Sequence, residues 1–217
     1  MTNLDRDDLE QPAGAGANVG QAQAGGRAKP ATPVGKNRWP KDNQEALIAF
    51  YGTPKTARLE SQLVDVVPPF AMTFTDDNGR TTPVRSIKFH RKCADALRAA
   101  LQEIWEKCGR DQAKINALGI QRFDGSYNPR LIRGSTTKWS NHAFGAAIDL
   151  AATDNAMGTG HGKMPQIVID AFKRQGARWG GDYKNRTDPM HFEFCGGGQA
   201  VEQPTPQHRA RAAVGTS

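Results

Sequence analysis

The spacing of apolar residues along the chain predicts three helices. The clearest spans 90–108, where apolar side chains recur every three or four positions and Gly109 follows. A shorter helix is expected at 43–51, because Gly52 suits the left-handed cap that ends many helices. A third should span 165–176, opening on a proline and ending on a glycine. The side chains of this third helix that we expect to point inward are Ile167, Val168, Ala171 and Phe172.

Strands are predicted in the remaining apolar segments. Residues 63–74 are rich in valine, proline and phenylalanine, and residues 84–89 alternate between apolar and polar. A turn over Asp76–Gly79 should join these short strands. The small apolar run at 146–151 is expected to be a buried strand that carries Asp149.

Composition sets the limits of this domain. Residues 1–36 and 199–217 are dominated by small, polar and proline residues, so we expect two disordered tails around a folded domain at 37–198. The first eleven residues contain four acids and no apolar core of a secretory signal, which predicts a protein that is cytoplasmic when made. No stretch is long and apolar enough for a membrane span.

The net charge and the cysteines do not identify a function. The net charge of +7 attracts polyanions, but the basic residues are scattered, so no specific nucleic-acid surface is expected. Cys93, Cys108 and Cys195 show no paired spacing, which predicts reduced thiols. We expect a monomer.

Two segments combine ionisable groups with small or apolar neighbours. In the first, 140–150, His142 and Asp149 should reach one point from a loop and a strand. In the second, 188–194, aromatic residues alternate with His191 and Glu193. A strand there would send the aromatics to the core and His191 to the opposite face.

These groups have the composition of a catalytic zinc site. Two imidazoles and one carboxylate, from His142, His191 and Asp149, leave a fourth tetrahedral position open for a water. Asp188 lies three residues before His191, close enough to act as the general base. Arg130 and Arg133 precede the first segment and are candidates for stabilising the developing negative charge. The ligand set prefers zinc without excluding manganese or cobalt.

The spacing resembles a known family. The pattern Ser140-x-His142-x-x-Gly145-x-Ala147-x-Asp149, followed by Asp188-x-x-His191, is similar to zinc D-alanyl-D-alanine carboxypeptidases and to L-alanyl-D-glutamate endopeptidases of phage endolysins. The resemblance covers roughly 39–193. It implies a small α+β, hedgehog-like fold with a central antiparallel sheet and flanking helices. It also implies zinc on His142, Asp149 and His191, a base at Asp188 and an arginine before the first motif. Three arginines lie in that region: Arg122, Arg130 and Arg133.

Several neighbouring residues have plainer interpretations. We interpret His90, His161 and His208 as ordinary surface or core histidines. Glu193 could be a second base, but an outer partner of a ligand or a solvent-facing acid is favoured. Cys195 is expected to pack at a strand end rather than to bind metal. The aromatics Phe144 and Trp179 could line the substrate cleft or simply pack.

The resulting hypothesis is hydrolysis of a peptide bond in the peptidoglycan stem, either L-Ala–D-Glu or terminal D-Ala–D-Ala. A phage-type lysis enzyme that acts on the wall after release fits best. One alternative is a non-catalytic zinc-binding interaction module, although the retained Asp188 argues against it. A weaker one is a nucleic-acid-binding protein with a structural zinc.

Overall fold

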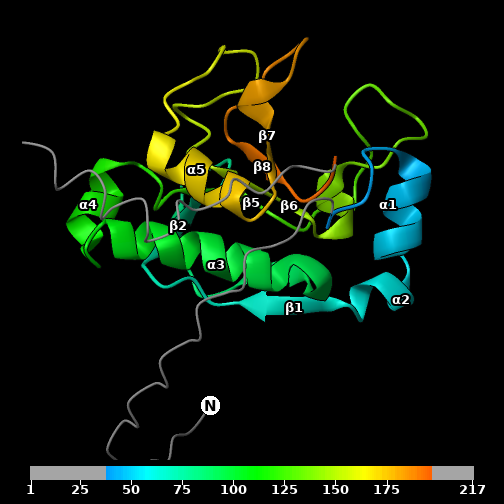
Figure 1. The fold of residues 1–217 in the computed structure, drawn as a ribbon, viewed down its shortest axis with the longest axis horizontal. Coiled ribbons are helices and arrows are strands. Elements are labelled where there is room, and N and C mark those ends of the chain that lie inside the picture. Colours follow the sequence, from blue (N-terminus) through cyan, green and yellow to red (C-terminus); the bar gives the residue numbers. More distant parts are fainter. Residues whose placement is uncertain (1–37, 197–217) are drawn as a thin grey trace, which may run out of the picture. The chain divides into compact units, whose positions relative to one another are not determined.

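The computed structural model describes residues 38–196 (Figure 1). The two predicted tails at 1–36 and 199–217, and with them His208, lie outside the described residues. The same holds for positions 37, 197 and 198 of the predicted domain. The domain limits therefore stay a prediction.

The first helices begin where side chains cap them. Helix α1 (Gln44–Tyr51) begins after Asn43, whose side chain accepts a hydrogen bond from the amide of Ala46 at 2.9 Å. It ends at Gly52, which has a φ of 103°. Helix α2 (Ala57–Glu60) is a single turn. The predicted helix at 43–51 is confirmed.

The apolar segments after α2 form four short strands. β1 (Leu63–Val66) pairs antiparallel with β4 (Ile87–His90), and β2 (Met72–Thr75) pairs with β3 (Thr81–Val84). The segment 63–74 divides into β1 and β2, because prolines 68 and 69 lack the amide hydrogen that would continue the ladder.

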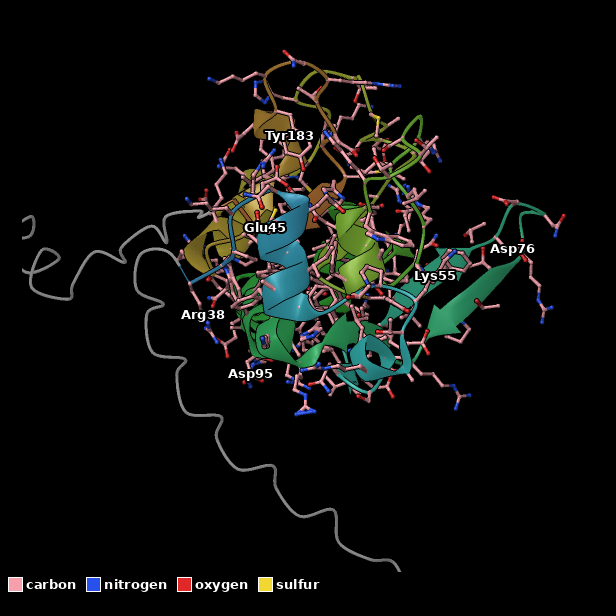
Figure 2. All side chains as sticks on the ribbon, turned by 90° about the vertical axis from the view of Figure 1, so that its right-hand side faces the viewer. Arg38, Glu45, Lys55, Asp76, Asp95 and Tyr183 are labelled. Carbon is pink, nitrogen blue, oxygen red and sulfur yellow. The ribbon has the colours of Figure 1, made fainter. Side chains whose placement is uncertain are left out.

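The predicted turn at Asp76–Gly79 is confirmed. The carboxylate of Asp76 accepts hydrogen bonds from the amides of Asn78 at 3.0 Å and Arg80 at 2.9 Å, which closes the β2–β3 hairpin. Figure 2 shows Asp76 at the tip of this hairpin, which projects from the rest of the domain.

Two longer helices lie side by side (Figure 1). Helix α3 (Arg91–Lys107) and helix α5 (Gln166–Arg174) confirm the predicted helices at 90–108 and 165–176. Helix α4 (Gln112–Ala117) was not predicted. On α5, Val168, Ala171 and Phe172 are buried as predicted, whereas Ile167 is only partly buried and Ile169 is buried in addition.

A four-stranded antiparallel sheet holds the two motifs. Its order is β5 (Phe123–Gly125), β6 (Ala147–Leu150), β8 (His191–Glu193) and β7 (Arg178–Trp179). The ring of Phe172 on α5 stacks on Phe192 of β8, with 4.2 Å between centroids. Phe192 and Phe194 are fully buried, as expected for the core side of the strand. The predicted α+β class with a small central antiparallel sheet and flanking helices is confirmed.

None of the helices in residues 38–196 combines the length and the apolar character needed to cross a membrane. The three cysteines are buried and take part in no disulfide, in agreement with the prediction of reduced thiols.

His90 is a core histidine, as predicted. It is fully buried at the start of α3, where its Nε2 donates to the carbonyl of Tyr51 at 3.1 Å. Its Nδ1 accepts from the amide of Lys92 at 3.2 Å and so caps the helix. A second proton on the ring would abolish this cap. Burial, together with the charges of Lys92 and Arg91 and against the Tyr51 hydrogen bond, lowers the pKa of His90 from 6.5 to about 4.

The stability of the protein is therefore expected to fall in weak acid. Between pH 6.5 and 4 the unfolded chain binds a proton at His90 more readily than the folded chain. Its contribution is fully present above pH 6.5 and is lost as the pH falls toward 4, on the order of 3 kcal/mol. Urea unfolding of wild type and His90→Asn across this range measures it, since the other titrating groups are common to both. Equal pH slopes for the two proteins would contradict the prediction.

Candidate metal centre

The register of two central strands places Asp149 beside His191. β6 and β8 run antiparallel with Asp149 directly opposite His191 and Ala147 opposite Glu193. Side chains of such a cross-strand pair leave the same face of the sheet, about 5 Å apart at Cβ. A shift by one residue would send either group into the core, so the register itself assembles half of the centre.

The third predicted ligand comes from a short 3₁₀ helix, η1 (Asn141–Phe144), where a loop had been expected. The hydroxyl of Ser140 caps it by accepting from the amide of His142 at 3.4 Å. Gly145 ends it with a φ of 64°. A Cβ on Gly145 would lie 2.7 Å from Leu63 Cδ2 and 3.1 Å from the His90 amide nitrogen. The Ser-x-His-x-x-Gly spacing is therefore the spacing of a capped turn that only glycine can close.

The donor atoms of the three predicted ligands meet at one point. His142 Nε2 lies 3.1 Å from Asp149 Oδ2 and 3.2 Å from His191 Nδ1. His191 Nδ1 lies 2.8 Å from Asp149 Oδ1. Both histidines are buried, and Asp149 is half-buried. These three residues form a group able to hold a metal ion.

Hydrogen bonds behind the two imidazoles decide which nitrogens face inward with a lone pair. His142 Nδ1 is 2.6 Å from the carbonyl of Ser126, which can only accept. His191 Nε2 is 3.2 Å from Glu193 Oε2, a carboxylate oxygen. Each ring therefore donates outward and turns its other nitrogen to the centre as an acceptor.

The inward-facing atoms fit zinc. Two imidazole nitrogens and a carboxylate form a set of acceptors, which needs a cation between its members. Bonds of about 2.0–2.1 Å in a tetrahedron place neighbouring ligand atoms about 3.3 Å apart. The separations of 3.1 and 3.2 Å around His142 lie close to this value, and the 2.8 Å from Asp149 to His191 is slightly shorter.

The pKa values of the ligands also indicate that the centre needs a positive charge. Burial raises the pKa of Asp149, but hydrogen bonds and charges from His142 and His191 outweigh burial and hold that pKa well below its usual range. Burial lowers the pKa of His191, but Asp149 and Glu193 outweigh it and raise the value to about 10. Without a metal ion, a proton on His191 thus balances the charge of the carboxylates.

Glu193 orients His191. It is only 2% exposed and accepts hydrogen bonds from Tyr183 Oη at 2.6 Å and from the side-chain amide of Asn141. Arg178 Nε lies 3.3 Å away. Burial raises its pKa, but His191, Tyr183 and Arg178 together lower the value to about 2. The geometry of Glu193 matches the predicted outer partner of a ligand. The alternative prediction that Glu193 is a solvent-facing acid was wrong.

A Glu193→Gln variant is expected to weaken zinc binding by about tenfold or more, because loss of a charged partner behind a ligating imidazole lowers its basicity. Competition titration with a chromogenic chelator gives the zinc Kd of each protein. Glu103→Gln is the matched control, because Glu103 is likewise a carboxylate held in ion pairs, with Lys107 and Arg174. Equal Kd values for wild type and Glu193→Gln would rule out the orienting role.

Asp188 is held next to the centre by its backbone. Its amide donates to the carbonyl of Gly180 at 2.9 Å, and its own carbonyl accepts from the amide of His191 at 3.0 Å. A Cβ on Gly180 would come within 2.2 Å of that carbonyl, so glycine is required there. The indole of Trp179 donates to the carbonyl of Pro189 at 2.8 Å. Both anchors fix the segment that carries the carboxylate.

The carboxylate of Asp188 is buried, with 7% exposure, and its Oδ1 has no hydrogen-bond partner among the described residues. Burial is the main cause that raises its pKa above the usual value; the charge of His191 acts against it and that of Asp149 with it. A buried carboxylate oxygen without a partner calls for one, which a water at the centre would supply.

The three arginines are placed differently. Arg122 is engaged in an ion pair with Asp154. Arg130 is half-buried, and its carbonyl accepts from the amide of Ser140 at 3.1 Å, which ties it to the start of η1. Arg133 is exposed in the following loop. Among the described contacts, none joins Arg130 or Arg133 to the ligands, so their role stays a prediction.

The remaining residues that the sequence analysis singled out are not among the three ligands. Phe144 and Trp179 are buried in the core, which fits packing, one of the two alternatives that the sequence left open. Cys195 is buried with its Sγ 3.4 Å from the side-chain nitrogen of Asn141. It shares a possible metal group with Asp42 and Glu193, but Arg178 already pairs with both carboxylates. His161 is exposed.

Comparison with known proteins gives the same family as the motifs. Residues 133–194 match a family described as D-alanyl-D-alanine carboxypeptidase. The match confirms the family resemblance. The matched segment contains all three candidate ligands together with Asp188 and Arg133, whereas Arg130 precedes it. It supports a metallopeptidase that acts on peptidoglycan-related substrates.

Proposed function

We propose that this chain hydrolyses a peptide bond of the peptidoglycan stem peptide, with zinc held by His142, Asp149 and His191. The observation that carries the proposal is the convergence of acceptor atoms from three residues, 2.8–3.2 Å apart, within a segment that matches a peptidase family. Three protein ligands leave a fourth position open, which is the arrangement of catalytic rather than structural zinc sites.

The reaction follows from the groups around that position. When bound, zinc supplies Lewis acidity, which acidifies water and polarises the scissile carbonyl. Asp188 accepts the proton of the attacking water and delivers it to the leaving amine. Its Oδ1 has no hydrogen-bond partner among the described residues. The pKa of Asp188 is raised toward neutral pH, and a base with such a pKa can also give its proton back.

Negative charge on the carbonyl oxygen calls for a fixed cation. We assign this role to Arg130 or Arg133, because Arg122 is already paired with Asp154. Arg130 has the closer backbone link to η1, and Arg133 lies inside the matched segment. The further assignment to wall lysis of the phage endolysin type rests on the resemblance of the motifs.

Digestion of purified peptidoglycan by the zinc-loaded protein, followed by mass spectrometry of the fragments, tests the proposal. Cleavage between L-Ala and D-Glu identifies an endopeptidase, and loss of one terminal D-Ala identifies a carboxypeptidase. New amino termini without new reducing ends are expected in both cases. A folded, zinc-bound protein that releases no fragment would instead support the non-catalytic zinc module.

A further inference from the structure

A basic pocket opens next to the metal centre. It has a volume of about 570 Å³ and is formed by the segment that follows β7, through η2 (Gly180–Asp182) and up to the residues before Asp188. Figure 2 shows Tyr183 on this segment. The residues that line the pocket are Arg178, Asp182, Tyr183, Lys184, Asn185 and Arg186.

Two positive charges in this pocket are free. Arg178 pairs with Asp42 and Glu193, and Lys173 pairs with Asp182 at 2.6 Å. Within residues 38–196, Lys184 and Arg186 take part in no ion pair, and both are exposed. The pocket therefore offers two unneutralised cations together with the amide side chain of Asn185. This combination suits an anion that also accepts hydrogen bonds.

The pocket is joined to the metal centre through two of its own walls. The hydroxyl of Tyr183 donates to Glu193, and Arg178 lies beside the same carboxylate. The ring of Tyr183 lies 6.5 Å from that of His191, centroid to centroid. None of the three ligands lines the pocket. An extended peptide advances about 3.3–3.6 Å per residue, so a peptide bound at the metal centre spans about 10 Å within three residues.

We infer that this pocket binds a free carboxylate of the peptide substrate, with Lys184 and Arg186 as specificity-determining residues. The inference rests on the proposed function, which supplies a substrate that carries carboxylates near the cleaved bond. This carboxylate has two chemically equivalent sources: the free carboxylate of a D-Glu residue and the terminal carboxylate of a C-terminal D-Ala. Both present a flat, singly charged group that lysine and arginine bind well.

The test measures binding separately from turnover. The full-length, zinc-loaded Asp188→Asn protein is titrated by calorimetry at low salt with N-acetyl-L-Ala-D-Glu and N-acetyl-D-Ala-D-Ala, each as free acid and as amide. The double substitution Lys184→Gln with Arg186→Gln is expected to raise the Kd of at least one free acid about five- to tenfold, as two exposed ion pairs allow. The Kd of the amides should not change. The peptide whose acid form responds names the source of the carboxylate.

The matched control removes the same charge elsewhere. Arg80→Gln with Arg85→Gln lowers the net charge equally on the β2–β3 side, which Figure 2 shows well away from Tyr183. This control should leave every Kd unchanged. Equal weakening of acids and amides, or none, would overturn the inference. So would binding of glycerol phosphate that is tighter than that of either peptide and lost in the Lys184/Arg186 variant, since the pocket would then serve wall phosphates.

The outcomes separate the pocket from the reaction. A carboxylate effect on Kd in a protein whose wild type digests no peptidoglycan would support the pocket and reject the proposed hydrolysis. Digestion of peptidoglycan with unchanged Kd values in the double variant would do the reverse.

Discussion

Replacement of Asp188 by asparagine is expected to lower kcat for peptide hydrolysis by about 10²- to 10⁴-fold, while zinc stays bound. Asparagine keeps the size of the side chain but cannot take up a proton at this place. The backbone bonds of Asp188 to Gly180 and His191 do not depend on the carboxylate, so the segment should keep its position. The measurement is single-turnover hydrolysis of a stem peptide together with the zinc content of each protein.

The control for this substitution is Asp95→Asn. Asp95 is an exposed carboxylate on α3, paired with Arg98, and Figure 2 places it at the opposite end of the view from Tyr183. The control should keep kcat within about twofold, as surface changes usually do. A kcat for Asp188→Asn close to that of wild type would exclude Asp188 as the base. Loss of zinc from that variant would assign it to the metal centre instead.

Removal of the metal is expected to abolish hydrolysis, and added zinc to restore it. The same loss should become permanent in His142→Ala, because this change deletes one of three ligands. Its zinc Kd should rise by more than the roughly 10- to 100-fold typical of an outer hydrogen-bond partner. Metal content by mass spectrometry and activity after dialysis against a chelator give the two results.

His161→Ala is the matched control, because His161 is exposed and stacks on Trp179 with 5.8 Å between ring centroids, outside the ligand group. It should keep both zinc and activity. Reconstitution with cobalt or manganese shows which ion the site prefers. Hydrolysis that continues in a demonstrably metal-free protein would reject the metal mechanism as a whole.

The helices and the two motifs could be predicted from the sequence because their signals are local. Helix periodicity and caps are local, so the 90–108 helix and the Gly52 stop are encoded by neighbouring residues. The alternation in 191–194 likewise fixed which side of β8 would face the core. The division of the apolar segments into the four strands β1 to β4 was harder to predict from the sequence, because the strand ends depend on which strand pairs with which.

By itself the sequence determined the chemical type of the candidate centre: two imidazoles, one carboxylate and a nearby acid, at a spacing that resembles one family. Only the tertiary structure decided how these groups meet. The β6–β8 register sets Asp149 opposite His191, and the partners Ser126 and Glu193 decide which ring nitrogens face inward. The free charges of the basic pocket also emerge only after distant partners have neutralised its other residues. Pairings between residues far apart in the chain leave no periodic signal, because they are made by packing rather than by local conformation.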